Sequence, residues 1–89
     1  MKVIMIYGSA NDKPFMEPAR EYLNTEAVTF EEHVLSAHRN LSELIDFLGE
    51  LEKSGEKAVI LAIAGLAAAL PGVVVMKTSL PVIGVPVPG

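Results

Sequence analysis

Cysteine is absent from this chain of 89 residues. Without cysteine the sequence offers no disulfide and no thiolate metal ligand, which fits a reducing compartment and leads us to expect a cytoplasmic protein. Basic residues are also scarce, since seven Lys and Arg stand against eleven Asp and Glu, for a net charge of -4. No block of positive charge is present to follow a phosphate backbone, so we expect no nucleic-acid partner.

Apolar residues, by contrast, are abundant and make up 51% of the sequence. A chain of this length suits one domain, residues 1–89, that buries somewhat more than about 60% of its unfolded surface. So apolar a composition is unusual for a small soluble monomer and indicates that part of the surface is covered by other subunits. We therefore expect a homo-oligomer.

One long apolar stretch raises the alternative of a membrane span. Residues 58–76 are nineteen consecutive positions without a polar side chain, between Lys57 and Lys77, which meets the length rule for a transmembrane helix. Gly65 and the break at Pro71 oppose that interpretation, and the alanines of the stretch contribute little to membrane insertion. From the residues alone, a membrane span and a buried strand followed by a loop both remain open.

The alternation of apolar runs with amphipathic segments predicts a doubly wound α/β fold with a parallel sheet. The expected strands are residues 2–7, 26–35, 57–63 and 80–85, with the second near the edge of the sheet and the third at its centre. A first helix should be capped by Asn11 or Asp12, although Pro18 is awkward inside it. The apolar residues that this helix is expected to bury are Phe15, Met16, Ala19, Tyr22 and Leu23.

A second helix is predicted to begin after Asn40, where Asn40 and Glu43 resemble a capping box, and to end near Ser54 and Gly55. Its expected apolar stripe consists of Leu41, Leu44, Ile45, Leu48 and Leu51. Ligands of open α/β sheets bind beyond the carboxyl ends of the strands, near the point where the strand order reverses. Three loops follow the carboxyl ends of predicted strands: residues 8–12 (GSAND), 36–39 (SAHR) and 64–72 (AGLAAALPG).

The first two of these loops carry the candidate binding groups. In GSAND, backbone N–H groups and the Ser9 hydroxyl at a helix N-terminus suit a phosphate, and Asp12 suits a sugar hydroxyl, unless Asn11 and Asp12 are only helix caps. In SAHR, Arg39 suits bidentate binding of a phosphate, and His38 is either a proton-transfer group or an ordinary loop histidine. His33 is expected on the surface, and its spacing to His38 is poor for a metal site, so we expect no metal.

Taken in order, the three loops resemble the PurE family of purine biosynthesis, which comprises N5-carboxyaminoimidazole ribonucleotide mutases and related aminoimidazole ribonucleotide (AIR) carboxylases. The likeness runs from end to end of the chain. The residues that carry it are Gly8, Ser9, Asp12, Met16, Val34, Ser36-Ala37-His38-Arg39, Ala64-Gly65, Ala67-Ala68, Leu70-Pro71-Gly72, Thr78 and Leu80 to Val87.

This resemblance implies a flavodoxin-like three-layer α/β/α subunit in an octamer that shares its active sites, with a helix over residues 71–76 and no membrane span. It implies transfer of a carboxylate from an exocyclic nitrogen to C4 of the aminoimidazole nucleotide, or carboxylation of that carbon by carbon dioxide, without any cofactor. His38 would handle the protons, and Ser9 and Arg39 would hold the 5'-phosphate, with Ser36 in support. The remaining substrate-binding positions would be Asn11 near the phosphate, Asp12 at the ribose, and Gly65, Leu66, Ala67 and Ala68 against the imidazole.

The chain departs from the family pattern in four ways. Asn11 stands where a second serine is usual, Leu66 replaces a commoner glycine, and Ala69 stands where the family has a second active-site histidine. The family's domain also continues beyond VIGVPV with another strand and a C-terminal helix. Loss of a positioned acid or base costs about 10² to 10⁴ in rate, so the alternative is an inactive PurE-like module that binds nucleotide or only assembles.

Overall fold

The computed structural model of the chain describes residues 1–65 and 69–88. This part of the chain contains one parallel sheet of four strands, whose order is β2-β1-β3-β4. The strands are β1 (Lys2–Tyr7), β2 (Phe30–Val34), β3 (Ala58–Gly65) and β4 (Val82–Val87). The predicted parallel α/β class is confirmed, as are the central position of β3 and the edge position of β2.

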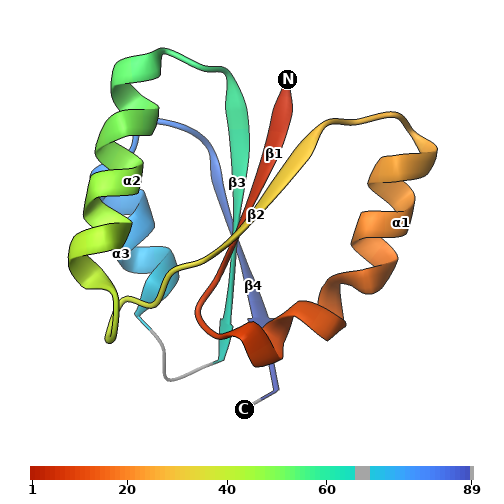
Figure 1. Cartoon of the computed structure of the whole chain (residues 1–89), viewed down its shortest axis with the longest axis horizontal. Helices are drawn as coiled ribbons and strands as arrows, with labels where there is room; N and C mark the ends of the chain where they lie inside the picture. Colours follow the sequence, from red (N-terminus) through yellow and green to blue (C-terminus); the bar gives the residue numbers. More distant parts are fainter. Residues whose placement is uncertain (66–68, 89) are drawn as a thin grey trace.

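Helices cover both faces of this sheet, so the expected three-layer arrangement is confirmed (Figure 1). A 3-10 helix, η1 (Ala10–Met16), and α1 (Glu17–Thr25) lie on one side, while α2 (Leu41–Ser54) and α3 (Leu70–Lys77) lie on the other. The larger core forms beneath α2 and α3, where Leu44, Leu48, Leu70 and Val74 pack on β1 and β3. The smaller core, around Met5, Tyr7, Met16, Ile63 and Val87, lies on the α1 side.

The first helical segment begins earlier than the sequence predicted. It also starts as a 3-10 helix rather than as an α-helix. The side chain of Ser9 caps η1 by accepting a hydrogen bond from the Asn11 backbone N–H at 3.2 Å, so the prediction of a cap at Asn11 or Asp12 is wrong. The α-helix then begins at Glu17, with Pro18 in its first turn. Proline is tolerated there because its missing N–H would have no partner inside the helix.

Burial along this segment also differs from the prediction. Met16 is buried and Ala19 and Leu23 are half-buried, but Phe15 is 51% and Tyr22 64% exposed, so those two burial predictions are wrong. The apolar spacing of an α-helix does not hold through Phe15, because η1 has about three residues per turn. Within α1, the residues that face the sheet are Ala19 and Leu23, one turn apart, and Tyr22 lies beside that face.

Helix α2 has a narrower buried stripe than expected. Leu44, Leu48 and Leu51 are buried, whereas Leu41 and Ile45 are 43% and 37% exposed, which contradicts the wider stripe. Its N-cap residue Asn40 makes no side-chain hydrogen bond to the helix backbone, so the capping box does not form as predicted. The helix ends as expected at Gly55, whose φ of 67° places it in the left-handed region that glycine adopts without strain.

The boundaries of three strands are shifted, and one of these is β3, which covers residues 58–65 rather than 57–63. β2 covers residues 30–34 rather than 26–35, because the chain first makes a turn at Glu26 and Ala27, where Ala27 has a φ of 56°. β4 covers residues 82–87 rather than 80–85, and Leu80 packs on the core from the preceding loop. Within the apolar stretch 58–76, residues 58–65 lie in β3 and residues 70–76 lie in α3. Among the described residues no helix has the length and apolarity needed to cross a bilayer.

A partly buried polar network ties α1 to the sheet. The Tyr7 hydroxyl donates to Glu32 Oε2 at 2.6 Å, and Arg20 donates to the same carboxylate at 2.8 Å and to Glu17 at 2.7 Å. The pKa of the Tyr7 phenol is raised well above its usual value. Burial is the larger cause, and the hydrogen bond to Glu32 is the next. At Glu32, desolvation acts to raise the carboxylate pKa, but the hydrogen bonds from Tyr7 and Arg20 outweigh it and lower the pKa overall.

Candidate functional site

A cavity of about 380 Å³ opens at the carboxyl ends of β1 and β3. These strands flank the point where the strand order reverses, which is where open α/β sheets bind ligands. The volume falls within the range of small-molecule sites, roughly 300–1,000 Å³. The described residues that line it are Gly8, Ser9, Asn11, Asp12, Ser36, Ala37, His38, Arg39, Ala64, Gly65 and Leu70.

The structure therefore brings together seven of the site residues predicted from sequence, which are Ser9, Asn11, Asp12, Ser36, His38, Arg39 and Gly65. Leu66, Ala67 and Ala68 fall outside the described residues. The site prediction did not include Gly8, Ala37, Ala64 or Leu70, which also line the cavity. Their signal was indirect: each belongs to, or directly follows, one of the three loops that share this edge of the sheet.

The floor of the cavity is a close contact between the ends of β1 and β3. The Gly8 backbone N–H donates to the Ile63 carbonyl at 2.9 Å. A Cβ atom at Gly8 would lie 3.3 Å from the Cβ of Ala64, a tighter contact than most side chains accept. Small residues at both positions therefore let the two strand ends approach and leave the space above them open.

The SAHR loop is held at both of its ends. Before it, the Leu35 N–H donates to the Tyr7 carbonyl at 2.9 Å, and after it the Asn40 N–H donates to the Ser36 carbonyl at 3.0 Å. Inside the loop, the Ser36 hydroxyl oxygen accepts the backbone N–H groups of His38 and Arg39, each at 3.1 Å. Ser36 is 8% exposed, whereas the side chains of His38 and Arg39 are exposed at the cavity.

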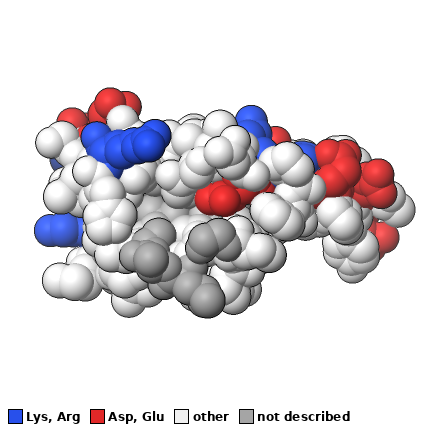
Figure 2. Space-filling view, turned by 90° about the horizontal axis from the view of Figure 1, so that it is seen from below, with Lys and Arg blue, Asp and Glu red and all other residues white. Residues whose placement is uncertain are grey.

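Among the described lining residues, Arg39 and Asp12 carry the formal charges. Seen from the carboxyl end of the sheet, a basic group lies on the α2 side of the hollow and an acidic group on the side toward α1 (Figure 2). A guanidinium binds phosphate or carboxylate oxygens in a fork geometry, and a carboxylate accepts hydrogen bonds from hydroxyls. This polarity suits a ligand with an anionic end and a hydroxyl-bearing part.

The third loop leads from β3 into α3. Ala64 is buried and Gly65 half-buried at the end of β3, and the helix expected over residues 71–76 is confirmed as α3. Ala69 is the exposed N-cap residue of α3 and makes no side-chain hydrogen bond to the helix. Its methyl group can neither transfer a proton nor bind an anion. The next residue, Leu70, is fully buried and lines the cavity.

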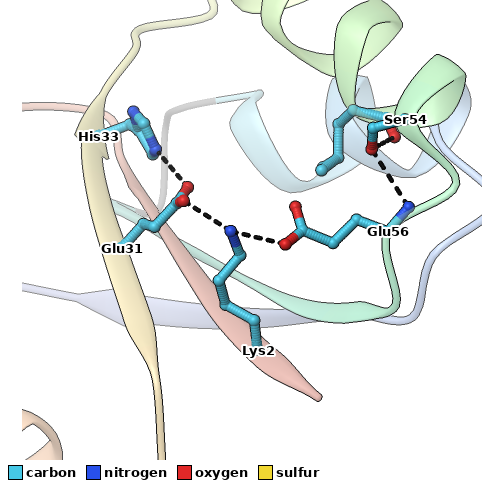
Figure 3. Close-up of polar contacts among 6 residues, drawn as sticks. Lys2, Glu31, His33, Ser54 and Glu56 are labelled. Carbon is cyan, nitrogen blue, oxygen red and sulfur yellow. Dashed lines mark hydrogen bonds and ion pairs between the residues drawn. The ribbon is translucent and has the colours of Figure 1, made fainter.

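His33 does not belong to this cavity. It is half-buried, with its ring 4.4 Å from that of Phe47 and its Nε2 atom 3.1 Å from Glu31. Glu31 in turn pairs with Lys2, which also pairs with Glu56 (Figure 3). Within the described ranges, no group of three or more His, Cys, Asp or Glu residues is placed to hold a metal ion.

The fold and the cavity together define a class of protein, a flavodoxin-like α/β domain with a cavity of small-molecule size at the point where its strand order reverses. More particularly, the chain belongs to the AIR carboxylase family, whose sequence profile matches residues 2–89.

Individual relatives agree with this assignment. The N5-carboxyaminoimidazole ribonucleotide mutase of Saccharolobus solfataricus is 48% identical over 87 residues, which are 98% of this chain and 54% of the relative. The mutase of Vibrio parahaemolyticus is 47% identical, over 98% of this chain and 53% of its own length. The crystal structure of Treponema denticola PurE superimposes with a TM-score of 0.88 at 28% identity, over 98% of this chain and 55% of that one. The chain thus spans about half the length of the curated relatives it matches.

Proposed function

We propose that this chain serves the PurE reaction of purine biosynthesis, the conversion of N5-carboxyaminoimidazole ribonucleotide to its C4-carboxylated isomer. The observation that carries the proposal is the meeting of His38, Arg39, Ser9 and Asp12 in one cavity. The names of the relatives favour this mutase (isomerase) reaction over the carboxylase (lyase) reaction on AIR with carbon dioxide.

Each end of the nucleotide has a matching group in the cavity. Arg39 binds the 5'-phosphate through its guanidinium, and the Ser9 hydroxyl and the N–H groups near Asn11 add hydrogen bonds. Asp12 accepts hydrogen bonds from the ribose hydroxyls. Gly65 lies against the flat imidazole, where the lack of a side chain permits close approach of the backbone.

The chemistry moves one carboxylate within the bound nucleotide and needs no cofactor. The bond between the exocyclic nitrogen and the carboxylate carbon breaks, the nitrogen gains a proton, and carbon dioxide is released inside the cavity. Ring carbon C4 then attacks the carbon dioxide, and the proton on C4 leaves as the new carbon–carbon bond forms. His38 is the group at the cavity that gives and takes these protons.

Ala69 lowers the rate of this reaction without removing its first histidine. The family's second histidine is absent, so one proton-transfer or carboxylate-binding group is missing from the site. We further propose that the protein acts in the cytoplasm as a homo-oligomer, with the octamer as the expected size. The alternative is an inactive module that binds the nucleotide or only assembles.

The test is turnover of N5-carboxyaminoimidazole ribonucleotide at high protein concentration by the unaltered chain, His38→Asn and Arg39→Gln. The proposal predicts a lower kcat for His38→Asn and a higher KM for Arg39→Gln. His33→Asn is the control, because His33 lies outside the cavity, and it should keep both constants. Protection of the unaltered chain against unfolding by AIR, without any turnover, would instead support the inactive module. A native mass determination tests the oligomer separately.

A further inference from the structure

Ser36 is a buried polar residue of the cavity, and its hydroxyl is hydrogen-bonded to backbone groups of its own loop. Apart from Tyr7, whose phenol is also buried, Ser36 is the one polar residue of the described chain that is buried, at 8% exposure. Its hydroxyl oxygen accepts the backbone N–H groups of His38 and Arg39 at 3.1 Å each. A hydroxyl has two acceptor sites, so both are occupied and only its own hydrogen remains to be donated.

The surrounding bonds leave this loop little freedom. Ser36 follows directly on Leu35, whose N–H is bound to Tyr7 of β1 at 2.9 Å. The Ser36 carbonyl accepts the N–H of Asn40, the residue from which α2 starts. With both ends anchored, the two bonds to the Ser36 hydroxyl determine how the backbone turns between them. That turn carries the side chains of His38 and Arg39.

We propose that Ser36 is a positioning residue, whose buried hydroxyl holds the backbone of His38 and Arg39 and so directs both side chains into the cavity. This inference rests on the proposed function, because it concerns the groups that bind and transform the nucleotide. It differs from direct support of the phosphate by Ser36, because that support would use the hydroxyl hydrogen as a donor, whereas holding the loop uses the hydroxyl oxygen as an acceptor. Displacement of reacting groups by about 1 Å can cost about 10²-fold in rate, so holding this backbone matters.

The first arm of the test measures backbone amide exchange in the ligand-free protein. In Ser36→Ala, the amide hydrogens of His38 and Arg39 lose their acceptor and should exchange about tenfold faster. Ser36→Thr keeps a hydroxyl at the same position and should restore slow exchange. Ser42→Ala, at an exposed position on α2, is the matched control and should match the unaltered chain.

The second arm measures binding of inorganic phosphate to the same four proteins, at a temperature where all are folded. Ser36→Ala should weaken binding by about tenfold, because Arg39 is no longer held in place, and Ser36→Thr should recover it. Unchanged exchange and unchanged affinity in Ser36→Ala would overturn the inference. So would weaker phosphate binding in Ser36→Ala with both amides still protected, because Ser36 would then act on the anion itself. If phosphate fails to bind the unaltered chain, the proposed function loses support, while amide exchange still decides whether Ser36 holds the loop.

Discussion

Gly8 and Ala64 meet at the floor of the cavity, where a Cβ atom on Gly8 would lie 3.3 Å from the Cβ of Ala64. The contact joins the end of β1 to the end of β3, the two strands between which the site opens. Any side chain at this position would make a tight contact to which Ala64 would have to adjust. A larger residue at either position would therefore affect both the packing of β1 on β3 and the shape of the cavity.

Replacing Gly8 by valine should lower the free energy of unfolding by about 1–3 kcal/mol, because the added methyl groups overpack the space against Ala64. Urea unfolding of both proteins measures the change. Gly49→Val is the matched control, since a Cβ on this helical glycine meets nothing within 4 Å. The control should change stability by less than about 0.5 kcal/mol. Equal effects of the two substitutions would contradict the close packing of Gly8.

Tyr7→Phe should destabilise the fold by about 1.5–3 kcal/mol, the range for a hydrogen bond to a charged group. The Tyr7 side chain is fully buried, and its hydroxyl donates to Glu32 at 2.6 Å. Chemical denaturation provides the measurement. Tyr22→Phe serves as the control, because Tyr22 is 64% exposed and its substitution should stay within about 0.5 kcal/mol of zero. An unchanged free energy of unfolding in Tyr7→Phe would show that the network does not help to hold α1.

Acid should destabilise the protein through carboxylates whose pKa is lowered by folding. A hydrogen bond from Lys2 lowers the pKa of Glu31, and hydrogen bonds from Thr78 and then Ser79 lower that of Glu52, each below 4.5. Their stabilising effect is complete above the unfolded pKa and is lost as the pH falls through the lower, folded pKa.

Thermal unfolding between pH 6 and pH 3 tests this dependence. The melting temperature should fall with pH, and Glu52→Gln should show a smaller fall because it has no carboxylate left to protonate. Glu21→Gln, at an exposed position on α1, is the control and should follow the unaltered chain. An identical pH dependence of the melting temperature in all three proteins would show that Glu52 does not contribute to the loss of stability in acid.

Ala27→Gly should stabilise the protein by about 1 kcal/mol, because alanine at a φ of 56° carries a steric cost that glycine avoids. Ala19→Gly, inside α1, should have the opposite sign and destabilise by about 0.5–1 kcal/mol. Urea midpoints of the two variants provide the comparison. Two changes of the same sign would contradict the left-handed conformation of Ala27.

Features of the fold that depend on neighbouring residues in the sequence could be predicted, whereas features that depend on the packing of distant segments could not. The strands could be predicted because residues such as Ile4 and Ile60 are buried in a parallel sheet covered on both faces, which leaves continuous apolar runs. The start of the first helix could not, because η1 has a different period and Ser9, not Asn11 or Asp12, is its cap. Exposure of Leu41 and Ile45 depends on how far α2 turns toward the sheet, which the helical period alone does not fix.

The site was predictable for a related reason. Loops after parallel strands converge at one edge, so the positions of Ser9, His38 and Gly65 in the cavity followed from strand order. The hydrogen bonds of Ser36 did not follow from it, because they depend on the conformation of a single turn. The contact of the His33 ring with Phe47 did not follow from it either, because it depends on how α2 packs beside β2.

The most direct test of the central claim is the rate of N5-carboxyaminoimidazole ribonucleotide conversion by Ala69→His beside that of the unaltered chain, at the same high protein concentration. If the cavity is a PurE active site that lacks one histidine, Ala69→His should raise the rate by about 10² to 10⁴. Adding His38→Asn to that variant should remove the gain. Absence of turnover in both the unaltered chain and Ala69→His would contradict the account.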